Sequence, residues 1–153
     1  MKEIIVYEMS FKGEIECRDE LPCIPFQKVY WKEYMQKYNA CFCEMRRDLE
    51  IEPVDFYSGY SQMESKADHT YLYLKNGVIA GGVSCYGNEV DDLFVDKPFQ
   101  RQGLGRKLLL WGMKHIREQG HQEVVLHAAE WNQSAVRLYL DVGFTIRKRE
   151  RVR

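Results

Sequence analysis

Residues 93–109 read LFVDKPFQRQGLGRKLL. The apolar run that closes at Val95 predicts a buried strand, Pro98 predicts a turn, and Gly103 and Gly105 open an apolar helix. The first N–H groups of a helix lack partners within it and carry the positive end of its dipole, so glycines there let an anion approach the bare backbone. Three basic side chains flank the same place: Arg101, Arg106 and Lys107. The segment therefore predicts a phosphate-binding loop at a helix N-terminus.

Two common nucleotide-binding motifs do not fit this loop. The dinucleotide fingerprint needs a third glycine three residues after the second, where Leu108 stands. A P-loop needs Gly-Lys followed by a hydroxyl residue that reaches magnesium, and the segment Gly105–Leu108 lacks both the spacing and the hydroxyl. The loop therefore predicts another kind of phosphate-bearing ligand.

The composition of the chain limits the function classes. Of its 153 residues, 45% are hydrophobic and 29% are charged, which fits one globular domain with a substantial core. The formal net charge of −1 argues against nucleic acid as a partner, because duplex binding uses a clustered basic surface. No stretch approaches the ~20 apolar residues of a membrane helix, and no signal-peptide region opens the sequence. We therefore expect a soluble, cytoplasmic protein that binds neither nucleic acid nor membrane.

The five cysteines are Cys17, Cys23, Cys41, Cys43 and Cys85. An odd number without a secretory signal predicts free thiols. Cys41 and Cys43 stand two apart in a helical pattern and so point in different directions, which disfavours a shared metal ion. The sequence places no histidine or cationic neighbour beside them to activate a thiol. Neither a metal centre nor a catalytic cysteine is expected.

The apolar pattern predicts an α/β domain with a mixed sheet. Ile4–Tyr7 favours a first strand, and apolar residues at intervals of three or four predict a helix or helix pair over 26–49, ended by Pro53. Asn76-Gly77 is a strong hairpin signal, because both turn positions need positive φ. Further expected elements are strands at 71–75, 78–85, 89–95 and 123–128, helices at 103–119 and 132–142, and a basic last strand from 144. A strand–helix–strand crossover of this length predicts that the strands 89–95 and 123–128 run parallel.

Two motifs resemble those of one protein family. Residues 100–105, QRQGLG, resemble the Q/R-x-x-G-x-G/A pyrophosphate loop of the GCN5-related N-acetyltransferases, the GNAT family, which use acetyl-CoA. Residues 132–144 match the family's Asn-x-x-Ala-x-x-x-Tyr-x-x-x-Gly-Phe segment at every named position. The resemblance covers about 70–147, which would be the cofactor-binding core. Residues 1–69 match only in their expected helices, which would frame the acceptor site.

The resemblance implies a fold and a cofactor-binding site. The fold would be a single GNAT-like α/β domain over 1–153, with a mixed, mostly antiparallel sheet, splayed parallel strands and helices on both faces. The backbone of Leu93, Phe94 and Val95 would bind pantetheine and polarise the thioester carbonyl. The pyrophosphate would lie on the loop made of Gln100, Arg101, Gln102, Gly103, Leu104, Gly105, Arg106 and Lys107. Asn132 and Ala135, which share a helix face with Tyr139, would contact the pantetheine arm.

Acetyl transfer to an amine needs a base and an acid. An amine of the lysine type has a pKa of ~10.4 and must lose a proton, and a thiolate leaving group benefits from a proton donor. The resemblance gives the acid role to Tyr139, which could instead be a buried aromatic with a satisfied hydroxyl. It gives the base role to Glu89, eleven positions before Gln100, with Asp91 and Asp92 as competing candidates.

Strand alternation bears on the choice of base. It places Glu89 and Asp91 on one face and Val90 and Asp92 on the other, so Glu89 or Asp91 would order a water that takes the proton. The other interpretation is that these carboxylates are exposed charges beside a turn. His127 is a further proton acceptor near neutral pH, or a structural histidine at a strand end.

The residues and the resemblance together predict an acetyl-CoA-dependent N-acetyltransferase without a metal. It would transfer the acetyl group directly to a primary amine of a small molecule or peptide. The tyrosines of the 26–49 segment would pack in the core or line the acceptor pocket. The resemblance also allows a homodimer. Two alternatives remain: a non-catalytic acyl-CoA-binding regulatory module, and a route through an acetylated cysteine.

Overall fold

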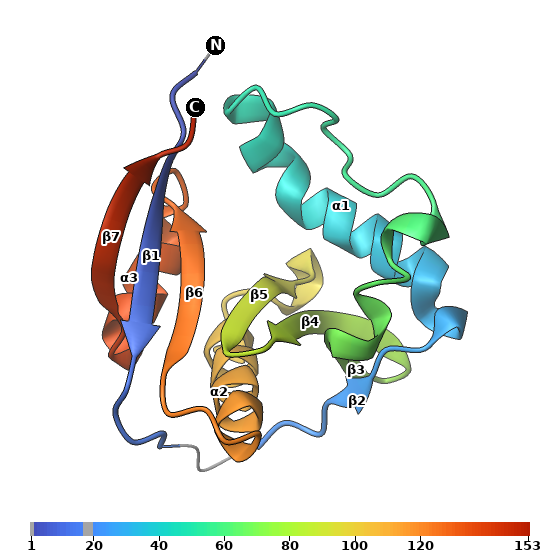
Figure 1. Cartoon of the computed structure of the whole chain (residues 1–153). Coiled ribbons are helices and arrows are strands. Elements are labelled where there is room, and N and C mark those ends of the chain that lie inside the picture. The colour runs from blue at the N-terminus through green and yellow to red at the C-terminus, as the bar shows by residue number, and fades with distance from the viewer. Residues whose placement is uncertain (1, 17–19) are drawn as a thin grey trace.

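The fold is built on one seven-stranded sheet with the order β2-β3-β4-β5-β6-β1-β7. The computed structural model describes residues 2–16 and 20–153 (Figure 1). Its strands are β1 (Ile5–Phe11), β2 (Ile24–Pro25), β3 (Thr70–Lys75), β4 (Val78–Tyr86), β5 (Glu89–Val95), β6 (Val124–Ala129) and β7 (Thr145–Arg151). Its helices are α1 (Trp31–Asp48), α2 (Leu104–Glu118) and α3 (Gln133–Val142), with short 3-10 turns at 28–30, 60–62, 67–69 and 97–99.

The predicted hairpin and crossover are confirmed. Asn76 and Gly77 take φ of +53° and +80° between β3 and β4, as the tight turn requires. Strands β2 to β5 then form an antiparallel succession, and α2 carries the chain from β5 to β6. Among the described strands, β5 and β6 are the one parallel pair. The predicted mixed, mostly antiparallel sheet is therefore correct.

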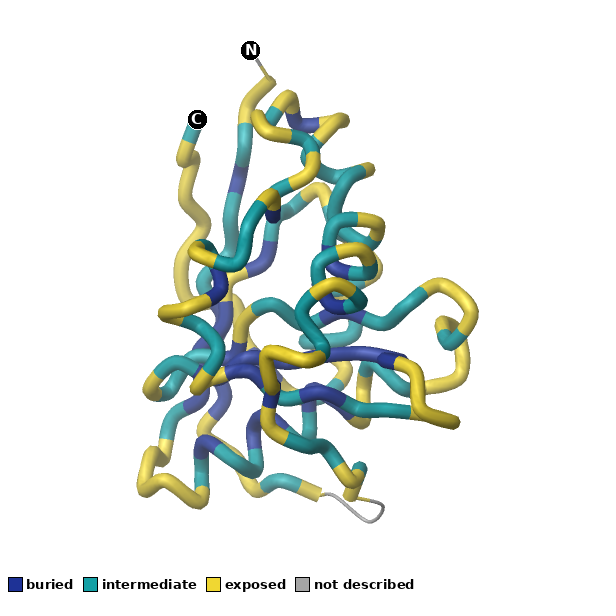
Figure 2. The backbone as a smooth tube through the Cα atoms, turned by 90° about the vertical axis from the view of Figure 1, so that its right-hand side faces the viewer, coloured by how far each residue is buried: buried dark blue, intermediate teal, exposed yellow. Residues whose placement is uncertain are grey.

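Strand β1 lies inside the sheet, between β6 and β7, and is antiparallel to both (Figure 1). The backbone N–H of Ile4 donates to the carbonyl of Arg153 at 3.0 Å, and that of Val152 donates to the carbonyl of Ile4 at 2.9 Å. The first and last strands thus pair with each other, and β1 joins this pair to β6. The residues of β7 are exposed throughout, as the basic pattern of 147–151 predicts for a solvated last strand (Figure 2).

Two apolar cores lie on opposite faces of the sheet. Helices α2 and α3 cover one, and α1 covers the other, which confirms helices on both faces. Two adjacent glycines of β4 face the two cores, one on each side of the sheet. A Cβ on Gly81 would lie 2.6 Å from Leu108 of α2, and a Cβ on Gly82 would lie 2.8 Å from the ring of Phe94 on the α1 side. Both positions therefore need glycine, because no side-chain atom fits there.

Helix α1 is shorter than the sequence predicts. The N–H of Phe26 donates to the carbonyl of Thr70 at 2.9 Å, which continues the extended pairing of β2 with β3 and keeps Phe26 outside the helix. At the other end, Glu50 takes φ of +55° and the N–H of Ile51 bonds to the carbonyl of Arg46. The helix has therefore ended at Asp48, and the prediction that Pro53 ends it is wrong.

Cys23, Cys41, Cys43 and Cys85 carry free thiols, and Cys17 lies outside the described residues. Burial raises the pKa of the thiols of Cys23 and Cys85 to about 12 in each case. Within residues 2–16 and 20–153, no group of three potential metal ligands lies close enough to hold an ion. In the same ranges, no helix has the length and apolar character needed to cross a membrane.

Candidate active site

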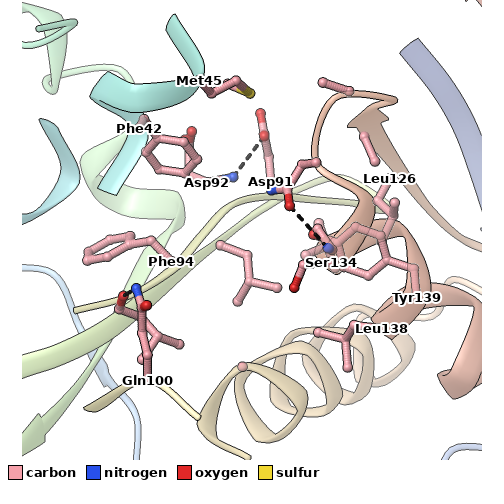
Figure 3. A pocket seen from close by; sticks show the side chains of 18 of the residues that line it. Phe42, Met45, Asp91, Asp92, Phe94, Gln100, Leu126, Ser134, Leu138 and Tyr139 are labelled. Carbon is pink, nitrogen blue, oxygen red and sulfur yellow. Dashed lines mark hydrogen bonds between the residues drawn. The ribbon is translucent and has the colours of Figure 1, made fainter. Parts of the chain in front are cut away.

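Strands β5 and β6 separate after two residues of pairing. Their register joins Glu89 to Val125 and Val90 to Leu126, and the pairing ends there. A cleft of about 660 Å³ opens beyond this point, with walls from α1, β5, the following loop, the start of α2, β6 and α3 (Figure 3). Past Val90, none of the described strands pairs with β5 on the edge that faces the cleft, so the backbone of that edge is open to a ligand.

Most of the predicted site residues line this cleft. Those from the predicted cofactor site are Leu93, Phe94, Val95, Gln100, Arg101, Gly103, Leu104, Gly105, Asn132 and Ala135. The other three, Gln102, Arg106 and Lys107, are exposed beside the loop and do not line the cleft. Of the predicted acid and base residues, Tyr139 and Asp91 line the cleft, whereas Glu89 does not.

The loop that carries Gly103 and Gly105, residues 100–105, closes one end of the cleft and is called the glycine loop below. The side-chain amide of Gln100 donates to the carbonyl of Val95 at 2.8 Å, which folds the loop back over the end of β5. Arg101 and Gly103 then take φ of +63° and +79°, and α2 begins at Leu104. The unpaired N–H groups of the first turn of α2 thus border the space beside β5.

Gly105 is not required by packing inside the protein. Its φ is not in the left-handed region, and an added Cβ would make ordinary contacts of 3.8 Å with Leu138 and Val95. A glycine within a helix is less favourable than alanine by about 1 kcal/mol. A small residue at this position leaves the helix N-terminus open to a ligand. The loop therefore fits the phosphate-bearing cosubstrate that the sequence implies.

Helix α3 supplies the opposite wall. Asn132 caps the helix, and its Oδ1 accepts a hydrogen bond from the N–H of Ala135 at 3.1 Å. Tyr139 stands one turn further along and faces the cleft from the same helix as Leu138 (Figure 3). Burial, with a smaller effect of the charge on Asp91, raises the pKa of the Tyr139 hydroxyl to about 12. The phenol is therefore protonated at neutral pH and can act as a proton donor.

A bulge in β5 separates Asp91 from Asp92. The pairing of β4 with β5 shifts between Gly82 and Ser84, and Asp92 takes φ of +51°. The N–H of Asp92 donates to Oδ1 of Asp91 at 2.8 Å. Asp91 is an exposed residue that borders the cleft, but the neighbouring protein buries part of its carboxyl. This burial, followed by the charge of Asp92, raises the pKa of Asp91 to about 6.

The side chain of Asp92 turns toward α1 and is only 8% exposed. Its Oδ1 accepts a hydrogen bond from the Tyr38 hydroxyl at 2.8 Å, and its Oδ2 accepts one from the Tyr86 hydroxyl at 3.2 Å. Lys66 Nζ lies 3.9 Å away. The prediction that Asp92 and Val90 share a face is wrong, because the bulge inverts the alternation and Val90 packs in the α2 core instead.

Glu89 belongs to a network of charges on the sheet. Its Oε1 lies 2.8 Å from Nδ1 of His127, and Oε1 of Glu8 lies 3.3 Å from Nε2 of the same ring. His127 itself lines the cleft, and both of its ring nitrogens lie beside carboxylates. Asp91, unlike Glu89, is a predicted base that borders the cleft.

Helix α1 adds residues that were not predicted individually. Tyr38, Phe42, Met45 and Arg46 line the cleft. Figure 3 shows Phe42 and Met45 close to Asp91 and away from Gln100 at the glycine-loop end. Their spacing of three and four residues was the available signal, but it indicates equally well a helix that packs in a core.

These features define an α/β fold of the acyltransferase type, in which a splayed parallel pair meets a glycine loop. Residues 28–144 match the model of the family described as "Acetyltransferase (GNAT) family". The chain therefore belongs to the GNAT family, and the predicted family and fold class are confirmed.

Curated relatives match a short part of the chain. Mycothiol acetyltransferase of Streptosporangium roseum is 46% identical over 57 residues, which are 37% of this chain and 17% of that protein. Mycothiol acetyltransferase of Thermobifida fusca is 43% identical over 58 residues, which are 38% of this chain and 18% of that protein. The matches thus span less than a fifth of the length of these relatives.

Solved structures share the whole fold at low sequence identity. A GNAT-family protein of Novosphingobium aromaticivorans has a TM-score of 0.73 and 18% identity, over 97% of this chain and 62% of that chain. A GNAT-family acetyltransferase of Colwellia psychrerythraea has a TM-score of 0.74 and 13% identity, over 97% and 54% of the two chains. AAC(6')-Iy, in complex with the bisubstrate analog CoA-S-monomethyl-acetylneamine, has a TM-score of 0.60 and 13% identity, over 85% and 94%.

Proposed function

We propose that this chain is an acetyl-CoA-dependent N-acetyltransferase that transfers the acetyl group directly to a primary amine of a small molecule or peptide. One observation carries the proposal: a single cleft joins the glycine loop, Tyr139 and Asp91. Family membership supports the acetyl donor, and the relatives named mycothiol acetyltransferases support the reaction class.

The proposed cosubstrate site uses backbone more than side chains. The first N–H groups of α2, freed by Gly103 and Gly105, would bind the pyrophosphate, with Arg101, Arg106 and Lys107 adding positive charge. The unpaired edge of β5 at 93–95 and the α3 face bearing Asn132 would hold the pantetheine arm. When bound, acetyl-CoA supplies a thioester that an amine can attack.

In the proposed reaction, Asp91 is the proton acceptor and Tyr139 is the proton donor. With a pKa of about 6, Asp91 is largely ionised at neutral pH and accepts a proton from the incoming ammonium, directly or through a water. The C–N bond forms and the C–S bond breaks, while Tyr139 gives its phenolic proton to the leaving sulfur. A second proton leaves the nitrogen as the amide forms and restores the tyrosine through solvent.

The test is an assay of free-thiol release from acetyl-CoA over a panel of primary amines, with mass spectrometry of the acetylated product. We expect release that depends on the amine, and loss of release in Asp91→Asn. Arg47→Gln, at an exposed position that does not line the cleft, is the matched control. Binding of acetyl-CoA with no release from any amine would contradict the transferase and favour the regulatory module. Retention of the acetyl group on the protein without an amine would favour the cysteine route.

A further inference from the structure

Arg46 continues the stripe of α1 that faces the cleft. It follows Phe42 by four residues and Tyr38 by eight, so all three lie on one side of the helix. The other members of the stripe present aromatic rings or, at Met45, a thioether. A permanently charged guanidinium therefore stands at a position where an apolar side chain would continue the pattern.

The protein holds the Arg46 head group in place without neutralising it. Its Nε donates to the carbonyl of Pro53 at 2.7 Å, and its guanidinium carbon lies 5.3 Å from the ring centroid of Phe56. The ion pairs formed by the described residues do not include Arg46. The Nη groups of a fixed guanidinium match the two oxygens of a carboxylate.

The location of Arg46 separates its ligand from the acetyl donor. Arg46 and Lys66 both lie over the ring of Phe56, and Lys66 Nζ is 3.9 Å from Asp92, the neighbour of Asp91. Gln100 marks the opposite, glycine-loop end of the cleft (Figure 3). Arg101 supplies positive charge at that loop end. An anion bound by Arg46 would thus belong to the second substrate and not to the pyrophosphate.

We infer that Arg46 binds a carboxylate of the acceptor, and that the acceptor is a molecule of the amino-acid type, with an amine and a carboxylate. The inference rests on the proposed function, because it assigns the substrate of the same cleft. Asp91 attracts the ammonium group and Arg46 attracts the carboxylate, so one zwitterion satisfies both charges. A polycation would place positive charge against Arg46 and is disfavoured.

Calorimetric titration in the presence of saturating CoA tests the inference by binding alone. The probes are ω-amino acids from glycine to 6-aminohexanoate, each paired with its amide, which keeps the amine and removes the negative charge. We expect at least one acid to bind about tenfold more tightly than its amide to the wild-type protein. Arg46→Gln should abolish this difference, and Arg47→Gln should keep it.

Three results would overturn the inference: equal binding of acids and amides, no binding of any acid, or an acid preference that survives Arg46→Gln. The proposed function fails separately. Acid-selective binding without thiol release would contradict the transferase while keeping the Arg46 subsite. Thiol release from neutral amines without an acid preference would keep the transferase and remove the subsite.

Discussion

The hydroxyl of Tyr38 donates a 2.8 Å hydrogen bond to Oδ1 of Asp92. The bond joins α1, which lines the cleft, to the bulge of β5 that follows Asp91. Because Asp92 is nearly buried, its carboxylate depends on protein donors in place of water. The position of α1 and that of the candidate base Asp91 are therefore linked through the side chain of Asp92.

Tyr38→Phe should lower the free energy of unfolding by about 1–3 kcal/mol, because it leaves a buried carboxylate with one donor fewer. Tyr86→Phe should cost less, since its bond to Asp92 is longer, at 3.2 Å. Urea denaturation of the two variants measures both effects. The reverse order would show that the Tyr38 bond is not the main support of the bulge.

The value of kcat/KM should rise as pH increases through about 6, where Asp91 becomes ionised. Asp91→Asn should lower activity and remove this limb of the pH profile. An unchanged profile in the variant would exclude Asp91 as the base.

Asp91→Asn, which should lower activity, should raise stability at neutral pH. Folding raises the pKa of Asp91 from 3.8 to about 6, so the folded state favours the protonated carboxyl. The resulting stability is full below the unfolded pKa and is lost as pH rises through 6. Asp91→Asn should therefore be more stable than the wild-type protein above pH 6 and show no gain below pH 4, as measured by denaturation at the two pH values.

Tyr139→Phe should reduce kcat by about 10²-fold while leaving the KM for acetyl-CoA nearly unchanged, because only the proton donor is removed. The ring, whose centroid lies 6.2 Å from that of Phe144, keeps its packing. Tyr71→Phe is a matched control, since Tyr71 packs against Trp111 and does not line the cleft. Steady-state kinetics with an ordinary amine measure both parameters. Full turnover in Tyr139→Phe would show that Tyr139 is not the acid.

Two glycines of the loop should respond differently to alanine. Gly103→Ala places a Cβ at φ of +79° and should destabilise the fold by about 1–2 kcal/mol. Gly105→Ala should leave stability unchanged or raise it by up to about 1 kcal/mol, because the added Cβ meets ordinary contacts. Thermal unfolding of both variants measures the difference. A large loss of stability in Gly105→Ala would mean that packing, not a ligand, requires this glycine.

The features that the sequence predicts well are set by local rules. Asn76-Gly77, the loop that ends in Gly103 and the capped segment from Asn132 each require particular residues at fixed spacing. The bulge at Asp92 has no such signal, because it depends on the register with β4. Simple alternation therefore groups Asp92 with Val90, whereas in the structure Asp92 bonds to Tyr38 of α1 and Val90 packs in the α2 core.

Long-range pairing set a second limit on prediction. The place of β1 between β6 and β7 depends on partners more than a hundred residues away, such as Val6 opposite Ala129. The sequence leaves the role of α1 open between core and pocket for a similar reason. Residues at helical spacing such as Tyr38 and Phe42 predict an apolar face, but only the folded sheet determines what that face meets.

The proposal that the cleft between β5 and β6 binds acetyl-CoA is tested by calorimetric titration of the folded protein with acetyl-CoA. The wild-type protein should show one binding site per chain, and Arg101→Glu, which reverses the charge at the loop end of the cleft, should bind about tenfold more weakly. No binding by the folded wild-type protein, or equal affinity in the folded variant, would contradict the proposal.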